Sequence, residues 1–332
     1  MSTIAVLGAG SYGTALAIQL ARLDNDTWLW GRNAEHLRQL ETERVNAEYL
    51  PGCKFPPRLR PTADLRAAIA DAEDLLVAVP SHALHAVLRI AAPLLKPQQG
   101  IASACKGLEP DTGKLVHEVV AGIVGRERKF AAISGPTFAR EVGLGMPTAV
   151  TVASTDPEYA EKIVHALHGH GFRAYTSDDV IGVEVGGSVK NVLAIAVGIA
   201  DGLGLGANTR AGVITRGLAE IMRLGEALGG RRETFMGLAG LGDLVLTCTD
   251  DQSRNRRMGL ALAKGKSLKE AQAEIRQVVE GVRAAPEVLR LARQHRIEMP
   301  ISEQVVRVLA GEIKPIEAVR YLATRPPRAE AG

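Results

Sequence analysis

The sequence has 332 residues, which is too long for one ordinary domain and close to the length of two. Hydrophobic residues make up 46% and charged residues 23%, so a disordered chain, a collagen-like repeat and a coiled coil are excluded. The net charge of +3 is too small to indicate a nucleic-acid partner, and it suits a small anionic ligand better.

The cysteine content and the absence of targeting signals bear on the compartment. Cys53, Cys105 and Cys248 are scattered and form no CxxC pair, so we expect a reducing, cytoplasmic environment. The N-terminus lacks the features of a signal peptide, and no apolar run reaches the length of about 18 residues that spans a membrane. We therefore expect no membrane insertion.

The first half of the chain alternates short apolar runs with amphipathic stretches. The apolar runs predict strands at 3–7, 26–30, 74–79, 99–104, 129–134 and 147–153. Helical patterns lie between them at 13–22, 34–44, 62–71, 82–92, 112–124 and 157–168. This alternation predicts an α/β fold, with a doubly wound, mostly parallel sheet that is covered by helices on both faces.

The pattern changes near Asp178. The chain beyond it shows no convincing strand and is dominated by long stretches rich in Ala, Gly and Leu, two of them at 183–203 and 208–227. We therefore predict a dinucleotide-binding Rossmann domain at 1–182 and an all-helical substrate and catalytic domain at 183–324. Residues 325–332 are expected to form a frayed tail.

A glycine-rich turn follows the first expected strand. Gly8, Gly10 and Gly13 form a GxGxxG motif that opens a helical run. Gly8 permits the tight turn, Gly10 lets the backbone approach a pyrophosphate, and Gly13 lets helix and strand pack closely. The strand–turn–helix context favours a dinucleotide site over an ordinary glycine-rich turn.

Arg32 follows the second expected strand, where an NAD-specific site usually carries an acidic residue for the ribose hydroxyls. An arginine at this place can bind the 2′-phosphate of NADP instead, and a solvated loop arginine is the alternative. We expect NADPH as the cofactor, with NADH also accepted.

Other strand ends carry further candidates. Lys106, on a tight loop before Gly107, would place an ammonium group beside the nicotinamide, although a surface lysine is the ordinary alternative. His82 follows another strand and could act as an acid, but a helix-start residue is the more ordinary interpretation. Thr137, near an expected helix start, suits an oxyanion or phosphate, and an N-cap explains it nearly as well.

Lys190 interrupts a run that is otherwise rich in Gly, Val, Ala, Leu and Ile. A buried lysine is costly unless it is paired or used, and burial lowers its pKa toward catalytically useful values. A helix face that points to solvent is the alternative. Asp243, in a glycine-rich apolar turn, is the expected partner that orients Lys190.

The run Ser253–Arg257 offers a hydroxyl, a carboxamide and guanidinium groups, which together suit an anion, although basic runs are often ordinary solvated faces. His165, His168 and His170 cluster without a neighbouring carboxylate ligand. A solvated helix end explains them better than zinc does, so no metal is expected.

These segments resemble those of the bacterial-type NAD(P)-dependent glycerol-3-phosphate dehydrogenases. The resemblance covers almost the whole chain and is carried by Gly8–Gly13, Trp30–Arg32, Tyr49–Gly52, Cys105–Gly107, Ser134–Thr137, Gly187–Asn191, Gly240–Leu244, Ser253–Asn255 and Val278–Gly281. It implies a Rossmann domain followed by an all-helical domain of the 6-phosphogluconate dehydrogenase type. It also implies reduction of dihydroxyacetone phosphate to sn-glycerol 3-phosphate, which feeds phospholipid synthesis.

The resemblance further implies site residues, position by position. Besides the three glycines and Lys106, the cofactor positions are Ser11, Tyr12, Arg32, Tyr49, Ala139, Arg254, Val278 and Glu280. The substrate positions are Lys106, Gly135, Thr137, Lys190, Asp243, Ser253, Arg254 and Asn255. Lys190 matches the proton-transfer residue, so the catalytic set is Lys190, Lys106 and Asp243.

Two other functions remain as alternatives. A related β-hydroxyacid dehydrogenase would share the fold and a helix-borne lysine, but it need not have the Ser253–Asn255 group. A non-catalytic dinucleotide sensor would keep the glycine motif without needing Lys106, Lys190 and Asp243. For each of these functions we expect a small-molecule ligand and no nucleic acid. The sequence does not decide whether the protein forms a homodimer.

Overall fold

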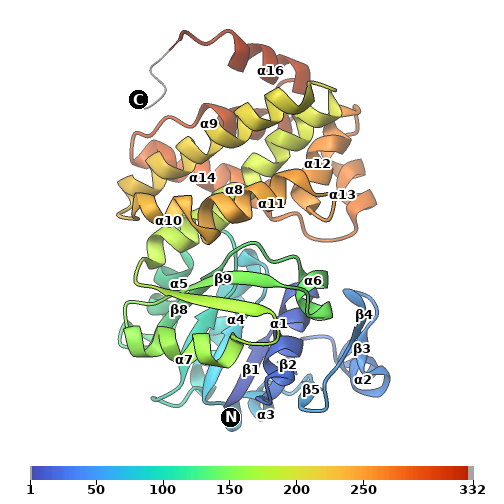
Figure 1. Cartoon of the computed structure of the whole chain (residues 1–332), viewed down its shortest axis with the longest axis vertical. Helices are drawn as coiled ribbons and strands as arrows, with labels where there is room; N and C mark the ends of the chain where they lie inside the picture. The colour runs from blue at the N-terminus through green and yellow to red at the C-terminus, as the bar shows by residue number, and fades with distance from the viewer. Residues whose placement is uncertain (1, 328–332) are drawn as a thin grey trace.

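The computed structural model, which describes residues 2–327, places a twisted sheet with its helices beneath a second region built only of helices (Figure 1). The sheet has eight strands in the order β10-β9-β8-β7-β6-β1-β2-β5. They are β1 (Thr3–Leu7), β2 (Asp26–Trp30), β5 (Leu59–Thr62), β6 (Asp74–Val77), β7 (Gly100–Ser103), β8 (Phe130–Ser134), β9 (Thr148–Ala153) and β10 (Phe172–Ser177). Neighbouring strands are parallel except β8 and β9, which are antiparallel.

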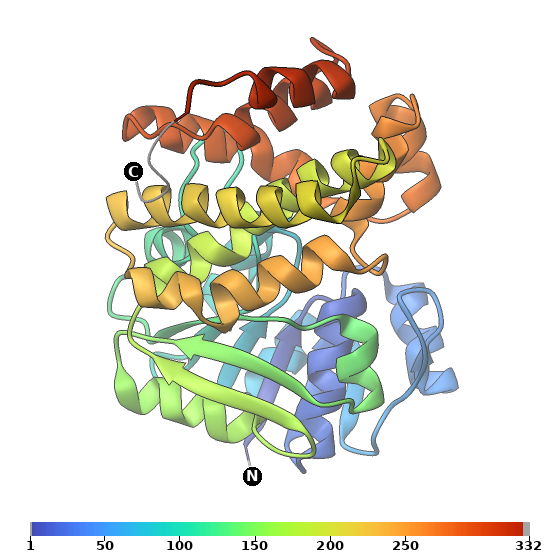
Figure 2. The same ribbon diagram turned by 45° about the horizontal axis from the view of Figure 1, so that its top comes forward.

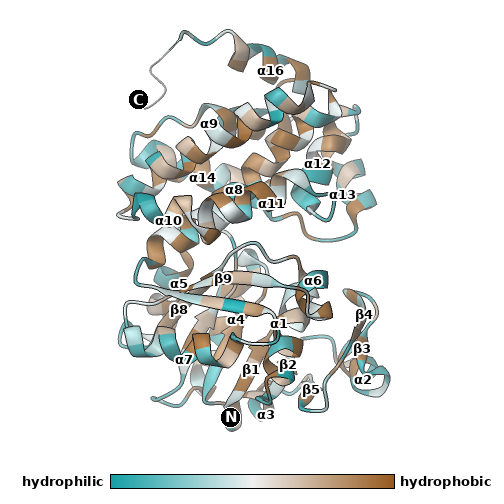
Figure 3. Cartoon of the chain, in the orientation of Figure 1, coloured by the Kyte–Doolittle hydropathy of each residue, from teal (hydrophilic) through white to brown (hydrophobic). Residues whose placement is uncertain are grey.

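Helices cover both faces of this sheet. They are α1 (Ser11–Arg22), α2 (Ala34–Glu43), α3 (Leu65–Ala70), α4 (Ser81–Ala91), α5 (Val116–Val124), α6 (Ala139–Leu144) and α7 (Pro157–Leu167), with a short 3₁₀ turn at Ala92–Leu94. Successive side chains of a strand point to opposite faces. In β1, Ile4 and Val6 join the core under α1 and α7, whereas Ala5 and Leu7 join the core under α4 and α5. Figure 3 shows the apolar colouring of β1 in the middle of the sheet.

The structure contains four short strands that the sequence analysis did not predict. Two are β5 and β10, and the others form a separate antiparallel pair, β3 (Val45–Asn46) and β4 (Leu50–Lys54). In the edge strand β10, Phe172 and Ala174 are buried while Arg173 and Tyr175 are exposed. Only these two of its six residues are buried, so the strand has no continuous apolar run that the sequence could show.

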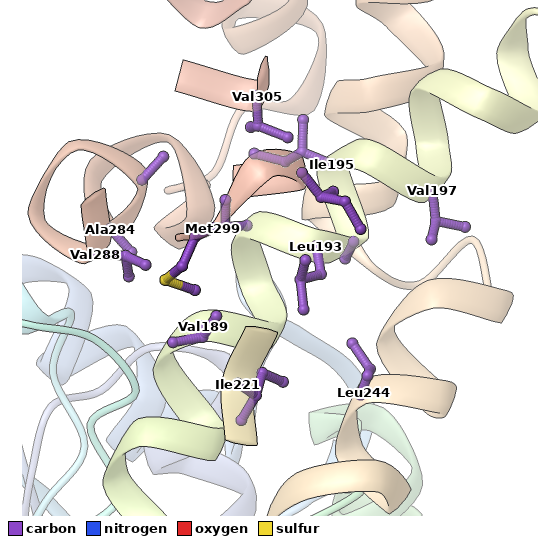
Figure 4. Packing of buried hydrophobic residues seen from close by; sticks show 14 of the residues in the cluster. Val189, Leu193, Ile195, Val197, Ile221, Leu244, Ala284, Val288, Met299 and Val305 are labelled. Atoms are coloured by element: carbon purple, nitrogen blue, oxygen red, sulfur yellow. The ribbon is translucent and has the colours of Figure 1, made fainter. Parts of the chain in front are cut away.

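The second region is organised around one long helix, α8 (Val180–Gly202). Around it lie α9 (Gly206–Ala227), α10 (Arg232–Met236), α11 (Asp243–Thr249), α12 (Arg254–Ala263), α13 (Leu268–Ile275), α14 (Glu280–Gln294), α15 (Pro300–Leu309) and α16 (Pro315–Ala323). A π-helical turn, Leu238–Gly242, leads into α11. Figure 4 shows Val189 and Leu193 of α8 among apolar side chains of the surrounding helices, such as Ile221, Leu244 and Val288.

Nearly all residues of α8 are buried, which explains why its sequence is apolar on every side. The helix is long and apolar enough to cross a membrane, but 89% of its most apolar window is buried inside the protein, as in a core helix. Glycines bring α8 and α12 into close contact. A Cβ at Gly198 would lie 2.1 Å from the carbonyl oxygen of Arg256, and one at Gly259 would lie 2.2 Å from that of Ile195.

The architecture confirms the expected fold class, a mostly parallel α/β sheet followed by helices. The expected boundary between 182 and 183 falls in the first turn of α8, after its N-cap Asp179, whose carboxylate accepts a hydrogen bond from the backbone N–H of Gly182 at 2.8 Å. Of the expected tail, residues 328–332 lie outside the described residues.

Candidate active site

The carboxyl ends of the central strands meet the helical region along one edge of the sheet, and Figure 2 shows the helices lying over that edge. Lys106 follows β7 and Gly135 follows β8, while Lys190 comes from α8 and Asp243 is the first residue of α11. Ligands of open α/β sheets bind at this edge because the loops there converge.

Asp243 is the centre of this group. The Lys106 Nζ donates to Oδ2 of Asp243 at 2.8 Å, and the Lys190 Nζ donates to Oδ1. Lys190 also donates to the hydroxyl of Thr247 at 2.8 Å, one turn further along α11. The side chains of Lys106, Lys190 and Asp243 are 15%, 7% and 2% exposed. The expected ion pair of Lys190 and Asp243 is present, and a solvent-facing Lys190 is excluded.

Burial and neighbouring charges shift the pKa values of Lys190, Lys106 and Asp243 in different directions. Burial lowers the pKa of Lys190 to about 8; the nearby Asp243 carboxylate opposes this, and the Lys106 ammonium adds to it. Burial also lowers the pKa of Lys106, but Asp243 and Tyr12 raise it by more, so the net shift is upward. Burial raises the pKa of Asp243, and the two ammonium groups lower it by more. Lys190 is therefore the stronger acid of the two lysines, and two ammonium groups beside one carboxylate leave a positive charge for an anionic ligand.

Tyr12 and Thr137 close one side of the group. The Lys106 Nζ lies 5.6 Å from the ring centroid of Tyr12 and donates to the carbonyl of Gly135 at 3.0 Å. The Thr137 hydroxyl lies 2.9 Å from the Tyr12 hydroxyl and 3.0 Å from the Gly135 carbonyl oxygen. The N-cap of α6 is Phe138, so the alternative interpretation of Thr137 as an N-cap is wrong.

The glycine motif has the geometry that a pyrophosphate requires. Gly8 has a φ of +126°, and a Cβ at Gly13 would lie 1.9 Å from the carbonyl oxygen of Gly8, so both positions require glycine. At Gly10 no atom lies within 4 Å of an added Cβ, which leaves open space. No side chain caps α1, so the backbone N–H groups at its start are free to bind phosphate oxygens. These residues fit a dinucleotide.

Asn46, which the sequence analysis missed, holds this turn in place. Its buried amide nitrogen donates to the carbonyl of Ala9 at 3.1 Å and to the hydroxyl of Thr14 at 2.9 Å. Its oxygen accepts from the backbone N–H of Tyr49 at 3.1 Å. The β3–β4 pair that carries Tyr49 is thereby fixed beside the glycine motif. A two-residue strand gives almost no sequence signal, which explains the omission.

Arg32 lies at the carboxyl end of β2, the strand next to β1, and its side chain is exposed. The following residue, Asn33, caps α2 by accepting from the backbone N–H groups of Glu35 and His36. The Arg32 guanidinium therefore extends from a fixed point beside the glycine motif. In this position the Arg32 guanidinium can bind the 2′-phosphate of NADP. An ordinary solvated arginine would be placed in the same way, so the structure is compatible with both interpretations.

Arg254 and Glu280 come from the starts of α12 and α14 and approach the same strand edge. The Ser81 hydroxyl donates to Oε2 of Glu280 at 3.2 Å, and that oxygen lies 3.6 Å from where a Cβ of Gly107 would stand. Burial raises the pKa of Glu280, and Arg254 opposes this shift. Of the remaining cofactor candidates, Ala139 begins α6 and Val278 is half-buried just before α14.

The run Ser253–Arg257 is not a solvated face. Ser253 is the buried N-cap of α12 and accepts from the backbone N–H of Arg256 at 3.2 Å. The amide of Asn255 donates to Oδ1 of Asn191 at 2.8 Å and accepts from the backbone N–H of Gly281 at 2.9 Å. One amide hydrogen of Asn255 remains, together with the unpaired N–H groups of the first helical turn and the Arg254 guanidinium.

Arg256 serves the structure instead of an anion. Its guanidinium pairs with Asp201 at 2.7 Å and with Asp251, and it donates to the carbonyl of Cys248 at 3.1 Å. Arg256 is therefore removed from the anion site expected of this run. Among residues 2–327, no group of three or more His, Cys, Asp or Glu side chains is placed to hold a metal ion.

Comparison with known proteins agrees with this geometry. A family model described as the NAD-dependent glycerol-3-phosphate dehydrogenase N-terminus matches residues 3–160, and the corresponding C-terminus model matches residues 179–320. A protein of Xanthomonas euvesicatoria named glycerol-3-phosphate dehydrogenase (NAD(P)+) is 54% identical, over 98% of this chain and 96% of its own. One of the same name from Shewanella halifaxensis is 52% identical, over 98% and 97%.

A solved crystal structure has the same fold over almost the whole chain. The glycerol-3-phosphate dehydrogenase of Coxiella burnetii is 49% identical and superposes with a TM-score of 0.95, over 98% of this chain and 99% of the other. A D-mandelate dehydrogenase, 14% identical with a TM-score of 0.63, shares the fold alone. The chain belongs to the family of NAD-dependent glycerol-3-phosphate dehydrogenases.

Proposed function

We propose that Lys190, Lys106 and Asp243 carry the chemistry by which this chain interconverts dihydroxyacetone phosphate and sn-glycerol 3-phosphate. The enzyme uses NAD(P), with both NADPH and NADH accepted. One observation carries the assignment of residues: two buried ammonium groups share one carboxylate at the strand edge, beside a glycine motif that fits a dinucleotide. No other group among the described residues combines these features.

The glycine motif would hold the pyrophosphate on the N–H groups at the start of α1, with Ser11 and Tyr12 in its first turn. Arg32 would bind the ribose phosphate, and Tyr49, Ala139, Val278 and Glu280 would line the rest of the cofactor. When bound, the nicotinamide supplies the hydride for ketone reduction and accepts it in the reverse direction. All further steps belong to the protein.

Lys190 is the proton donor in ketone reduction. Hydride addition to the central carbon places negative charge on the carbonyl oxygen, and an ammonium group with a pKa of about 8 is an effective acid for it near neutral pH. Lys106 keeps its proton more firmly and stabilises the developing charge. Asp243 binds both Nζ atoms and so fixes their orientation.

The start of α12 binds the substrate phosphate. The Arg254 guanidinium, the hydroxyl of Ser253, the remaining amide hydrogen of Asn255 and the first N–H groups of the helix supply donors and positive charge. Gly135 and Thr137 complete the opposite wall. This phosphate site favours a phosphorylated ketone over the unphosphorylated acid of a β-hydroxyacid dehydrogenase, and a dinucleotide sensor would not need the lysine pair.

The glycerol 3-phosphate formed would enter phospholipid synthesis in the cytoplasm, where the buried and unpaired state of all three cysteines is typical. Oxidation of NADPH by the purified protein tests the proposal. Dihydroxyacetone phosphate should support it, whereas unphosphorylated dihydroxyacetone and 2-keto acids should be very poor substrates. Equal rates with all three would contradict the phosphate site, and no oxidation at all would contradict the activity.

A further inference from the structure

A buried acid–base pair lies behind the proposed active site and has no part in the mechanism above. Nδ1 of His117, on α5, lies 2.7 Å from Oε2 of Glu184, and the backbone N–H of His117 donates to Oε1 at 2.9 Å. Glu184 belongs to α8, the helix that also carries Lys190. The Glu184 side chain is 3% exposed and that of His117 is 31% exposed, so only the histidine reaches solvent.

On its outer side, His117 lines a pocket of about 500 Å³ at the amino end of β8, the opposite end from Gly135. The charged residues that line this pocket are Arg126, Glu127, Arg128, Lys129, Asp156, Asp178, Asp179 and Arg231. Lys129 pairs with Asp156 at 2.9 Å, and Arg231 pairs with Asp178. Charged groups therefore line this pocket beside apolar ones, and the partly exposed histidine ring reaches water there.

On its inner side, Glu184 lines a second cavity, of about 10 Å³, together with Ser103, Lys106 and Ser134. The Ser134 hydroxyl is buried without a hydrogen-bond partner in the part of the chain that the structure describes. A Cβ at Gly187 would lie 2.7 Å from that hydroxyl, so glycine at this turn of α8 keeps the space open. A cavity of this size accommodates one water molecule, which needs two to four polar partners, and Ser103, Ser134 and Glu184 supply them.

We propose that His117 and Glu184 form a proton relay that connects solvent in the outer pocket, through one water molecule in the inner cavity, to Lys106 and Lys190. The proposal rests on the catalytic roles proposed for the two lysines. It adds two residues to the machinery of the reaction and assigns them proton transport, with no contact to the substrate.

The balance of the relay follows from the reaction. When the ketone receives a hydride at its central carbon, Lys190 gives a proton to the oxygen and becomes a neutral amine. Lys106 and Lys190 share the Asp243 carboxylate, so a proton that enters at Lys106 can restore the ammonium of Lys190. The Lys106 proton is replaced from Glu184 through the water, Glu184 takes one from His117, and His117 takes one from solvent. Each ketone reduced consumes one solvent proton, and oxidation releases one by the same path.

A path through His117 and Glu184 is useful because the cofactor and substrate would cover the other side of the two lysines while hydride is transferred. The contacts and burial of the pair shift the pKa values of both of its members. Burial lowers the pKa of His117, but its hydrogen bond to Glu184 and the charges of Glu184 and Glu118 raise it by more, so the net shift is upward. Burial raises the pKa of Glu184, and His117 opposes this shift. The pKa values of both members of the pair are therefore raised above their ordinary values.

Chemical rescue of His117→Ala tests the relay. The variant should reduce dihydroxyacetone phosphate with a kcat about tenfold lower and an unchanged KM for NADPH, because one proton-transfer group is missing. Added imidazole should enter through the outer pocket and restore kcat in a saturable manner. Pyrazole has the same shape but is not basic at neutral pH, so it should restore nothing.

The controls separate proton transfer from packing. His85→Ala removes a histidine of an equally close pair, 2.7 Å from Glu109, on the exposed side of α4, and it should keep the wild-type kcat. Glu184→Gln keeps the size of the side chain but cannot take up and release a proton, so its kcat should fall without rescue by imidazole. Thermal unfolding of each variant checks the fold, and Glu184→Gln supplies the test if His117→Ala does not fold.

Several results would overturn the relay: an unchanged kcat in both variants, equal rescue by imidazole and pyrazole, or a loss in His117→Ala that neither compound restores. Each of them leaves the wild-type reduction of dihydroxyacetone phosphate intact and so spares the proposed function. A wild-type protein that does not reduce the ketone would instead overturn the proposed function itself.

Discussion

The ammonium groups of Lys106 and Lys190 bind different oxygens of a single buried carboxylate, that of Asp243. The two lysines come from different regions of the fold, one from the loop after β7 and the other from α8, so their contact also joins the sheet to the helices. Asp243 is common to both, and its removal should have the largest effect on the folded protein.

Asp243→Asn should destabilise the protein by about 3–5 kcal/mol, because it leaves two buried positive charges without their counter-ion. Denaturant unfolding measures this change. The double variant Asp243→Asn with Lys106→Met should recover part of the loss, since one of the two uncompensated charges is gone. Equal stability of the single and double variants would show that the charges are not what Asp243 compensates.

Arg32→Ala should weaken NADPH selectively, by roughly tenfold in KM, if one charge-assisted contact of ~1.5 kcal/mol to the 2′-phosphate is lost. The KM for NADH, which has no such phosphate, should stay the same and serves as the internal control. An equal loss for both cofactors would assign Arg32 to another part of the dinucleotide.

Arg254→Ala should raise the KM for dihydroxyacetone phosphate by about 10- to 100-fold, because it removes a guanidinium from the phosphate site. Lys264→Ala removes an exposed cation at the C-cap of the same helix, so it is the matched control and should change this KM little. The ratio of kcat/KM for the phosphorylated and the unphosphorylated ketone shows whether Arg254 binds the phosphate. A preference that survives in Arg254→Ala would refute the assignment.

The rate should depend on pH in opposite senses for the two directions. The pKa of Lys190 lies at about 8, below its ordinary value, because burial penalises its charged form. Ketone reduction needs the ammonium, so its kcat should be full below that pH and should fall as the pH rises through it. Oxidation of glycerol 3-phosphate needs the neutral amine, so its kcat should rise over the same interval. Parallel profiles in the two directions would contradict the acid–base role.

Local pattern made much of the fold predictable. β1 and β2 coincide with the strands predicted at 3–7 and 26–30. In β1 the four successive residues Ile4–Leu7 are buried and apolar, as is typical of a strand that helices cover on both faces. The edge strand β10 was missed because its exposed side carries Arg173 and Tyr175. The two-residue strand β3 was missed because so short a segment has no period to detect.

Within the site, the pairing of Lys190 with Asp243 was predictable because both charges stand alone in apolar surroundings. The second contact of Asp243, with Lys106, was not, because it joins residues 137 positions apart that only the packing of the two regions brings together. The internal hydrogen bonds of Asn255 depend in the same way on Asn191 from α8 and Gly281 from α14. Sequence indicated which residue types belong to the site, and tertiary structure decided their partners.

The most direct test of the account compares the pH profiles of kcat for ketone reduction in Lys190→Met and Lys106→Met. Both substitutions keep an apolar stem of similar length and remove the charge. Lys190→Met should lower kcat by about 10²- to 10⁴-fold and abolish the fall of kcat near pH 8, with NADPH binding retained. Lys106→Met should also lower kcat but keep a pH-dependent fall. A near-normal kcat in Lys190→Met, or a profile that only Lys106→Met abolishes, would contradict the account and move the proton donor to Lys106.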